Sequence, residues 1–121
     1  MGEHALMKVL RWDESARAFS PDKMKKVGLF ESERFFLDLY CLEPGQGQKA
    51  HAHEGCDKIY LVVEGRARVQ VGAETRALVA GECVMAASGE VHGLENDSPA
   101  RAVVLTFMAP KPGKHSSTQS H

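Results

Sequence analysis

The chain has 121 residues, of which 43% are hydrophobic and 26% are charged, and its formal net charge is −1. A chain of this length is typical of one domain that buries a core of its own, while the near-neutral charge without a basic stripe argues against nucleic acid as a partner. The three cysteines form no C-x-x-C pair, no apolar run reaches membrane-spanning length, and the start MGEHALMK lacks a secretory signal, so we expect a cytoplasmic protein with no membrane partner.

The first third of the chain predicts two strands separated by a polar connection. Residues 6–12 (LMKVLRW) predict a short strand, and residues 13–26 are polar, contain Pro21 and predict turns. Residues 33–42 (ERFFLDLYCL) are rich in aromatic and aliphatic side chains and predict a second strand, which the following proline and glycine end. Both segments precede a stretch that carries two closely spaced histidines.

The rest of the chain is a series of short extended segments separated by turn residues. These segments are IYLVV, RARVQVG, residues 76–79, ECVMAA, VHGLEN and ARAVVLTF. In RARVQVG a period-2 alternation places Ala67, Val69 and Val71 on one face. Turn signals at a spacing of roughly 8–12 residues, without a convincing amphipathic helix, are typical of an all-β sandwich or barrel of antiparallel strands.

Three of the histidines lie among the predicted strands and turns, and the others lie near the ends of the chain. Residues i and i+2 of an extended segment point to the same side, so His51 and His53 can direct both imidazoles at one point. His92, just after a predicted turn, is the remaining candidate for a third ligand. Neutral imidazole is the commonest protein ligand for borderline divalent metals. The three residues therefore predict a metal site, although His-x-His by itself also fits unrelated exposed or hydrogen-bonded histidines.

Glycines surround these histidines and predict where the strands end. Residues 45–65 (GQGQKAHAHEGCDKIYLVVEG) begin and end with glycine around His-x-His. Residues 81–96 (GECVMAASGEVHGLEN) run from a glycine through Ser-Gly and a histidine to an asparagine. In residue types and spacing, the two segments resemble the two motifs of the cupin superfamily. The short stretch between them, residues 66–80, is similar to that of small single-domain cupins.

This resemblance implies an antiparallel double-stranded β-helix, the jelly-roll barrel of the cupins. It implies one domain over residues 1–110, with the two motifs in its core, and a tail at residues 111–121 whose almost entirely polar composition predicts disorder. A small-molecule substrate or ligand inside the barrel is also implied. Small single-domain cupins are often dimers, so we expect a homodimer, to which the strand at residues 6–12 can contribute by joining a partner's sheet edge.

The chain departs from the cupin motifs at two positions. Ala87 stands where the family usually has a proline, which is a mild change because the following Ser-Gly pair can still form the turn. Lys58 stands where the family has its metal-binding glutamate. A charged lysine has no lone pair to offer a metal, and its ammonium group repels a nearby cation.

Three arrangements of the site remain open. In the first, a metal keeps the three histidines and takes water or substrate at its other positions, as the resemblance to cupins with an all-histidine triad implies; the thiol dioxygenases, which bind ferrous iron, are the family example. In the second, a nearby carboxylate or thiol takes the vacant place, and the candidates are Glu54, Cys56, Asp57 and Glu90. In the third, the site is metal-free and Lys58 anchors an anion.

The first arrangement predicts a metal-dependent oxidoreductase of the dioxygenase type, with His51, His53 and His92 holding iron, zinc, nickel or manganese. Lys58 would project into the cavity, where it binds an anionic substrate group or donates a proton, or it extends out of the barrel mouth. Tyr60 faces the same side and either lines the cavity or packs in the core. Because cupins also include decarboxylases, isomerases, binding modules and metal-free proteins, the alternative is a non-enzymatic module that binds or senses a small anion near Lys58.

Overall fold

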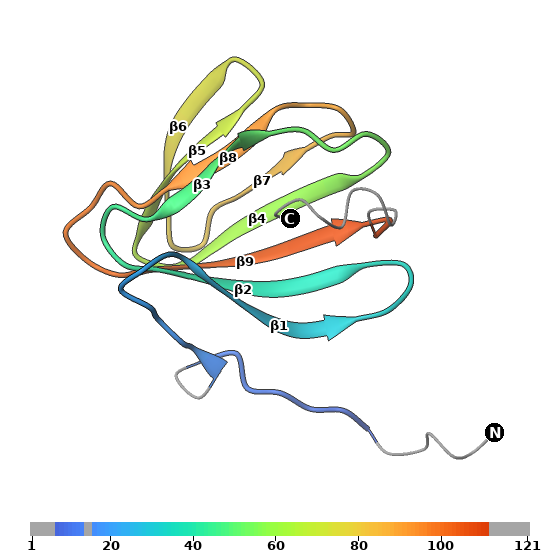
Figure 1. Ribbon diagram of the computed structural model, residues 1–121, viewed down its shortest axis with the longest axis horizontal. Helices are drawn as coiled ribbons and strands as arrows, with labels where there is room; N and C mark the ends of the chain where they lie inside the picture. The colour runs from blue at the N-terminus through green and yellow to red at the C-terminus, as the bar shows by residue number, and fades with distance from the viewer. Residues whose placement is uncertain (1–6, 14–15, 112–121) are drawn as a thin grey trace.

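Two antiparallel β-sheets face each other and enclose the core (Figure 1). The computed structural model describes residues 7–13 and 16–111. In this part of the chain the strands are β1 (Lys25–Glu31), β2 (Phe36–Leu42), β3 (Gly47–His51), β4 (Asp57–Glu64), β5 (Arg66–Val71), β6 (Glu74–Val79), β7 (Cys83–Ala86), β8 (His92–Glu95) and β9 (Ala102–Ala109). One sheet has the order β1-β2-β9-β4-β7 and the other β3-β8-β5-β6. This all-β antiparallel architecture, with crossovers between the sheets, confirms the predicted fold class.

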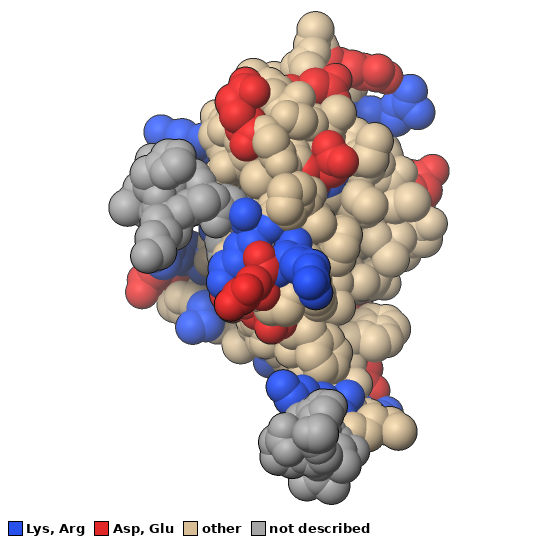
Figure 2. All heavy atoms as spheres, turned by 90° about the vertical axis from the view of Figure 1, so that its right-hand side faces the viewer, with Lys and Arg blue, Asp and Glu red and all other residues tan. Residues whose placement is uncertain are grey.

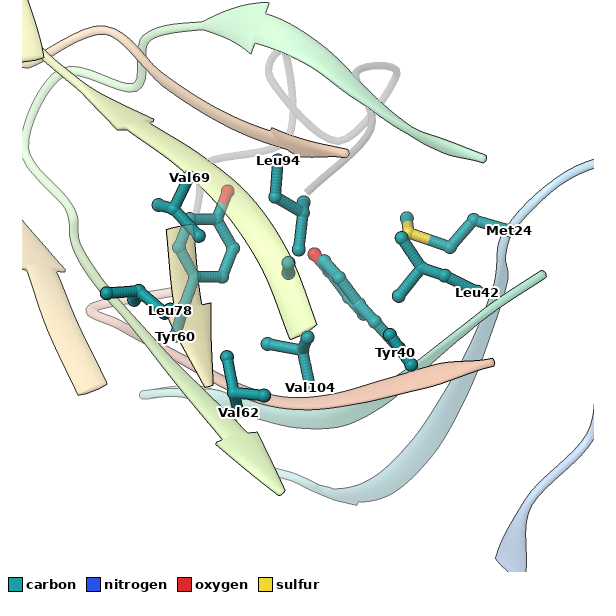
Figure 3. Close-up of a cluster of buried hydrophobic side chains, with 11 residues drawn as sticks. Met24, Tyr40, Leu42, Tyr60, Val62, Val69, Leu78, Leu94 and Val104 are labelled. Atoms are coloured by element: carbon teal, nitrogen blue, oxygen red, sulfur yellow. The ribbon is translucent and has the colours of Figure 1, made fainter. Parts of the chain in front are cut away.

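The five-stranded sheet contributes one face of its central strands to the core. Tyr40 of β2 lies opposite Val104 of β9, and Val104 lies opposite Val62 of β4. All three side chains are fully buried, because alternate residues of a strand point to the same side of the sheet. Figure 3 shows this cluster, in which the hydroxyl groups of Tyr40 and Tyr60 are directed away from Val62 and Val104. The tyrosines therefore connect the apolar core to the rest of the barrel interior.

The alternation predicted for the segment RARVQVG is confirmed in β5. Ala67 and Val69 are buried, Arg66 and Arg68 are exposed, and Gln70 and Val71 are half-buried. β5 pairs with β8, where Val71 lies opposite His92 and Val69 lies opposite Leu94. The buried face of β5 thus lies directly beside the strand that begins with the third histidine.

The predictions for the N-terminal quarter are wrong in two places. Residues 7–12, the described part of the predicted strand 6–12, form no strand, and the side chains of Met7 and Val9 are 85% and 74% exposed. Within the described part of the chain no neighbouring strand pairs with this segment, so its backbone has no ladder to join. The predicted turn region 13–26 ends earlier than expected, because β1 begins at Lys25 and forms the edge of the five-stranded sheet.

Several expectations about partners and boundaries stay predictions. Apart from Lys111, the predicted tail at residues 111–121 lies outside the described residues, as does Leu6. The residues that the structure describes contain no helix of the length and apolarity that a membrane crossing needs. On the end of the barrel shown in Figure 2, basic and acidic side chains are interspersed. The domain boundary, the homodimer, the cytoplasmic location and the absence of a nucleic-acid partner are not tested by these features.

Candidate metal centre

Three histidine side chains meet where β3 ends and β8 begins. His51 is the last residue of β3 and pairs across the sheet with His92, the first residue of β8, while His53 lies two residues further along the chain. One nitrogen of each ring lies within 4.8 Å of a nitrogen of each other ring. His53 and His92 are 6% and 2% exposed, and His51 is half-buried. The three imidazoles are therefore positioned to hold one metal ion.

Two glycines let β3 and β8 approach closely enough for this pairing. A Cβ atom on Gly93 would lie 2.8 Å from the carbonyl oxygen of Gln48, and one on Gly47 would lie 2.4 Å from the carbonyl oxygen of Leu94. Both neighbours are backbone atoms, so a larger residue at either position would push the strands apart. Between Gln48 and His51 the register shifts, so that β3 has one residue more than β8 over this stretch.

Hydrogen bonds between two loops hold His53 beside His51 and His92. The amide of Gly89 donates to the carbonyl oxygen of His53 over 2.9 Å. The amide of Gly55 donates to the Ser88 hydroxyl over 2.7 Å, and the amide of Ser88 donates to the Asp57 carboxylate over 3.0 Å. The loop between β3 and β4 is thus joined to the turn that precedes β8. This arrangement carries His53 to the strand of His92.

The ring orientations follow from hydrogen bonds to the backbone. Nδ1 of His51 lies 2.8 Å from the carbonyl oxygen of Lys49, and Nδ1 of His92 lies 2.9 Å from that of Glu90. Because a carbonyl oxygen only accepts, each Nδ1 carries the proton and each Nε2 keeps its lone pair. The Nε2 atoms of His51 and His92 are buried and have no hydrogen-bond partner among the described residues. Buried lone pairs of this kind fit a metal ion, so the residues present suit a divalent metal.

The protonation of these rings also suits a metal site. Burial lowers the pKa of His92 to about 4 against the opposing effect of the Glu90 carbonyl, and the nearby charge of Lys58 lowers it further. Burial likewise lowers the pKa of His51, with the Lys49 carbonyl opposing and Lys58 adding to the effect. Both rings are therefore neutral near pH 7, which is the form that binds a metal.

The ligand set contains no carboxylate or thiol. In the described part of the chain, the one group of side chains that could hold a metal consists of the three histidines. Of the carboxylates considered for the vacant place, Asp57 accepts a hydrogen bond from the Ser88 amide and Glu90 accepts one from the Ala87 amide over 2.9 Å. These two side chains hold the turn before β8. Three nitrogens remain, and the other coordination positions are left to water or a small molecule.

Lys58 points into the barrel. Its side chain is 1% exposed, so it does not extend out of the barrel mouth. Its Nζ donates a hydrogen bond to Oε1 of Gln48 over 3.2 Å and lies 5.2 Å and 5.5 Å from the ring centroids of Tyr60 and Tyr40. Burial lowers the pKa of Lys58 to about 7, the charge of Lys26 adds to this, and Asp38 opposes it.

Tyr60 takes part in both the core and the site. Its side chain is fully buried in the main hydrophobic cluster, and its ring centroid lies 6.2 Å from that of His92. The hydroxyl group donates a long hydrogen bond of 3.5 Å to Oε1 of Gln48. Burial raises the pKa of Tyr60 above its ordinary value. The hydroxyl is therefore a hydrogen-bond donor beside the histidines and not an anion.

Sequence reasoning missed the polar residues that surround Lys58. Gln48, Asp38 and Thr106 are 9%, 5% and 2% exposed, and Lys26 is half-buried. The alternation of β2 contains a signal for one of them, because Asp38 shares its face with Tyr40 in an otherwise aromatic and aliphatic strand. Gln48 carries no such signal, since the register shift between it and His51 breaks the alternation of β3.

Comparison with known proteins assigns the family. A family model described as the cupin domain matches residues 38–108, so the chain belongs to the cupin family. An uncharacterized protein of Streptomyces coelicolor, SCO3923, is 30% identical over 107 residues, which cover 87% of this chain and 99% of that protein. TT1209 from Thermus thermophilus has a crystal structure with a TM-score of 0.82 and 42% identity, covering 85% of this chain and 98% of that one. A protein of Klebsiella pneumoniae with a double-stranded β-helix domain, 24% identical over 89% of this chain and 95% of its own, shares the fold with a TM-score of 0.79.

Proposed function

We propose that this cupin is a metal-dependent enzyme that acts on a small molecule, an oxidoreductase of the dioxygenase type with His51, His53 and His92 as its metal ligands. The observation that carries the proposal is the set of three converging imidazoles without a carboxylate. Three protein ligands leave coordination positions open, and open positions distinguish catalytic metal sites from closed structural ones.

The metal determines which chemistry such a site supplies. Iron, when bound, supplies redox chemistry with oxygen, whereas zinc, nickel or manganese supply a Lewis acid or an activated water. The contribution of the chain is to hold the ligand rings in one orientation. The backbone carbonyl groups of Lys49 and Glu90 do this for His51 and His92, and Val71 lies opposite His92 on the neighbouring strand.

Lys58 and Tyr60 are the side chains that we assign to the substrate. With a pKa of about 7, the Lys58 amino group can hold a proton or release it near neutral pH, as a general acid or base requires. In its charged form the same group can bind an anionic oxygen of the substrate. Gln48 orients both side chains, because its Oε1 accepts hydrogen bonds from Lys58 and Tyr60.

Metal analysis and oxygen consumption test the proposal. Tag-free protein should contain a transition metal at close to one ion per chain by elemental analysis. Protein loaded with ferrous iron should consume oxygen with at least one member of a panel of thiols, diketones and phenols. The His51→Ala variant is the matched control and should do neither. If wild-type protein shows no oxygen uptake and no compound perturbs the spectrum of the metal, the proposal is wrong.

A second candidate function is a non-enzymatic module that binds or senses a small anion. The burial of Lys58 beside the histidines favours it, because an anion would compensate the charge of a buried ammonium group. This candidate expects anion binding by metal-stripped protein, loss of that binding in the Lys58→Met variant, and no turnover by metal-loaded protein. Turnover that depends on the three histidines would exclude it.

A further inference from the structure

A cavity of about 600 Å³ opens between the start of β1 and β3 and reaches the metal centre. Lysines dominate its lining, and the lining includes no acidic residue. Its polar lining residues are Lys23, Lys25, Lys26, Lys49, Gln48 and His51. This volume is in the range of small-molecule sites. Because His51 is both a wall of the cavity and a member of the histidine cluster, a molecule in the cavity lies next to the metal position.

The inner part of this region carries a surplus of positive charge. Nζ of Lys26 lies 5.7 Å from the centroid of the Tyr40 ring, and Nζ of Lys58 lies 5.5 Å from the same centroid. The acidic group that acts on both lysines is Asp38, which is 5% exposed. Two ammonium groups thus share one carboxylate in a partly dehydrated space. Both lysines would therefore attract a further anionic group in this space.

The Gln48 side chain offers a donor toward the same space. Its Oε1 faces the Lys58 ammonium group, and since an ammonium group only donates, this contact fixes which end of the amide is oxygen. The Nε2 atom at the other end is buried and has no hydrogen-bond partner among residues 7–13 and 16–111. Gln48 also acts on the Tyr40 hydroxyl through its side chain, where it opposes the rise in pKa that burial causes. A buried N–H donor without an acceptor is costly unless a ligand supplies one.

We propose that this cavity binds the carboxylate group of a small organic acid, with Lys26 and the Gln48 amide as its partners and the rest of the molecule directed to His51. Lys23, Lys25 and Lys49 are exposed to water, so the less exposed groups decide which anion fits. With Lys58 protonated, Lys26, Lys58 and Asp38 together carry one positive charge, which a carboxylate matches, whereas inorganic phosphate carries nearly two negative charges. The inference rests on the proposed function in one respect only: organic acids are the substrates of the metal centre only if that centre is catalytic.

Calorimetric titration of metal-stripped protein tests the carboxylate site. The probes are pyruvate and malonate, with pyruvamide as the uncharged counterpart and inorganic phosphate as the other anion. Wild-type protein should bind at least one carboxylate saturably, should not bind pyruvamide, and should bind phosphate more weakly. Absence of saturable carboxylate binding, or phosphate binding that is equal or tighter, would overturn the inference.

Three variants assign the residues. Lys26→Met should weaken carboxylate binding about tenfold or more, as expected for the loss of one charge-assisted hydrogen bond. Gln48→Glu places a negative charge where the donor was and should abolish binding, with circular dichroism as the check on folding. Lys8→Met removes the same charge from an exposed position before β1 and should change nothing. Equal affinity in wild-type protein and Lys26→Met would contradict the assignment.

Zinc binding by the same proteins separates this inference from the proposed function. If Lys26→Met binds zinc like wild-type protein and loses the carboxylate, the carboxylate site is supported independently of any turnover. Carboxylate binding by protein that binds no metal would leave the inference standing and remove the proposed function. Metal binding and oxygen uptake without carboxylate binding would support the proposed function and overturn the inference.

Discussion

The interior of the barrel has two ends that the same strands build from different side chains. At one end, the inward side chains are apolar and fully buried: Leu42 from β2, Val104 from β9 and Val62 from β4. At the other end these strands turn polar side chains inward, at 5%, 2% and 1% exposure: Asp38, Thr106 and Lys58. The register is regular from Asp38 to Leu42 of β2 and from Lys58 to Val62 of β4, and it shifts only beyond Val62. Between the two ends the difference therefore lies in the side chains and not in the backbone.

The comparison separates what stabilises the fold from what carries chemistry. Burying an apolar side chain contributes about 1.5–3 kcal/mol, so the apolar end drives closure of the two sheets. Burying Lys58 works in the opposite direction, because its ammonium group loses water, and the contacts with Gln48 and two aromatic rings and the attraction of Asp38 do not keep its pKa at the ordinary value. The polar end therefore lowers the free energy of unfolding, and burial of side chains at the apolar end offsets this loss.

The largest expected effect is on metal binding at the polar end. Removing His51 and His92 together takes away two of three ligands, so affinity for zinc or ferrous iron should fall by three orders of magnitude or more, while each single alanine variant should lose on the order of 100-fold. Competition with a chelating dye measures the affinities. The free energy of unfolding of the metal-free protein should change by less than about 1 kcal/mol. Retention of stoichiometric metal in the double variant would remove the histidine cluster as the metal centre.

The next effect belongs to the apolar end. Leu42 is fully buried in the main hydrophobic cluster, so Leu42→Ala should lower the free energy of unfolding by about 3 kcal/mol through lost transfer energy and a cavity. Urea titration followed by circular dichroism measures it. Under native conditions the folded variant should keep the metal affinity of the wild type, because Leu42 lies far along β2 from Asp38 and the polar end. A large loss of metal affinity would show that the two ends are not separable.

The features that the sequence predicted are those set by short-range rules. Period-2 alternation placed Ala67 and Val69 in the core, and glycine spacing with the cupin resemblance led to the fold class. The pairing of His51 and His53 followed from the i, i+2 geometry of a strand, and His92 followed as the third residue. The structure brings these three side chains within reach of one ion.

The features that were missed depend on contacts between distant segments. β1 begins within a lysine-rich stretch whose residue pattern does not predict a strand. It is a strand because it pairs with β2. The predicted strand at residues 6–12 has suitable composition but no described neighbour. Lys58 could extend outward or inward by sequence alone, and its direction is set by Gln48 on the other sheet. The sequence therefore did not predict the polar end, because contacts between the two sheets set the direction of its side chains.

Lys58→Met tests the energetic cost of the polar end. Replacing the ammonium group with an apolar side chain of similar length should remove a desolvation penalty of several kcal/mol, while the Gln48 oxygen loses the shorter of its two hydrogen bonds at a cost of about 1–3 kcal/mol. We expect a net gain of about 1–2 kcal/mol in the unfolding free energy of metal-free protein at pH 7, from urea titration. The Lys8→Met variant, exposed in the folded chain, should be unchanged. A destabilised Lys58→Met protein would mean that Lys58 supports the barrel.

The smallest effect is the pH dependence of the unfolding free energy that Lys58→Met gains over the wild type. The pKa of Lys58 is about 7 in the folded protein and about 10.4 in an unfolded chain. Between these values the unfolded state binds a proton that the folded state has released, so the unfolding free energy of the wild type should rise with pH by about 1 kcal/mol per unit from pH 7.5 to 9. Lys58→Met lacks this contribution, while Lys26, whose pKa burial also lowers, is present in both proteins. The advantage of Lys58→Met should therefore shrink as pH rises, and a difference that stays constant across this range would show that Lys58 keeps its proton in the folded barrel.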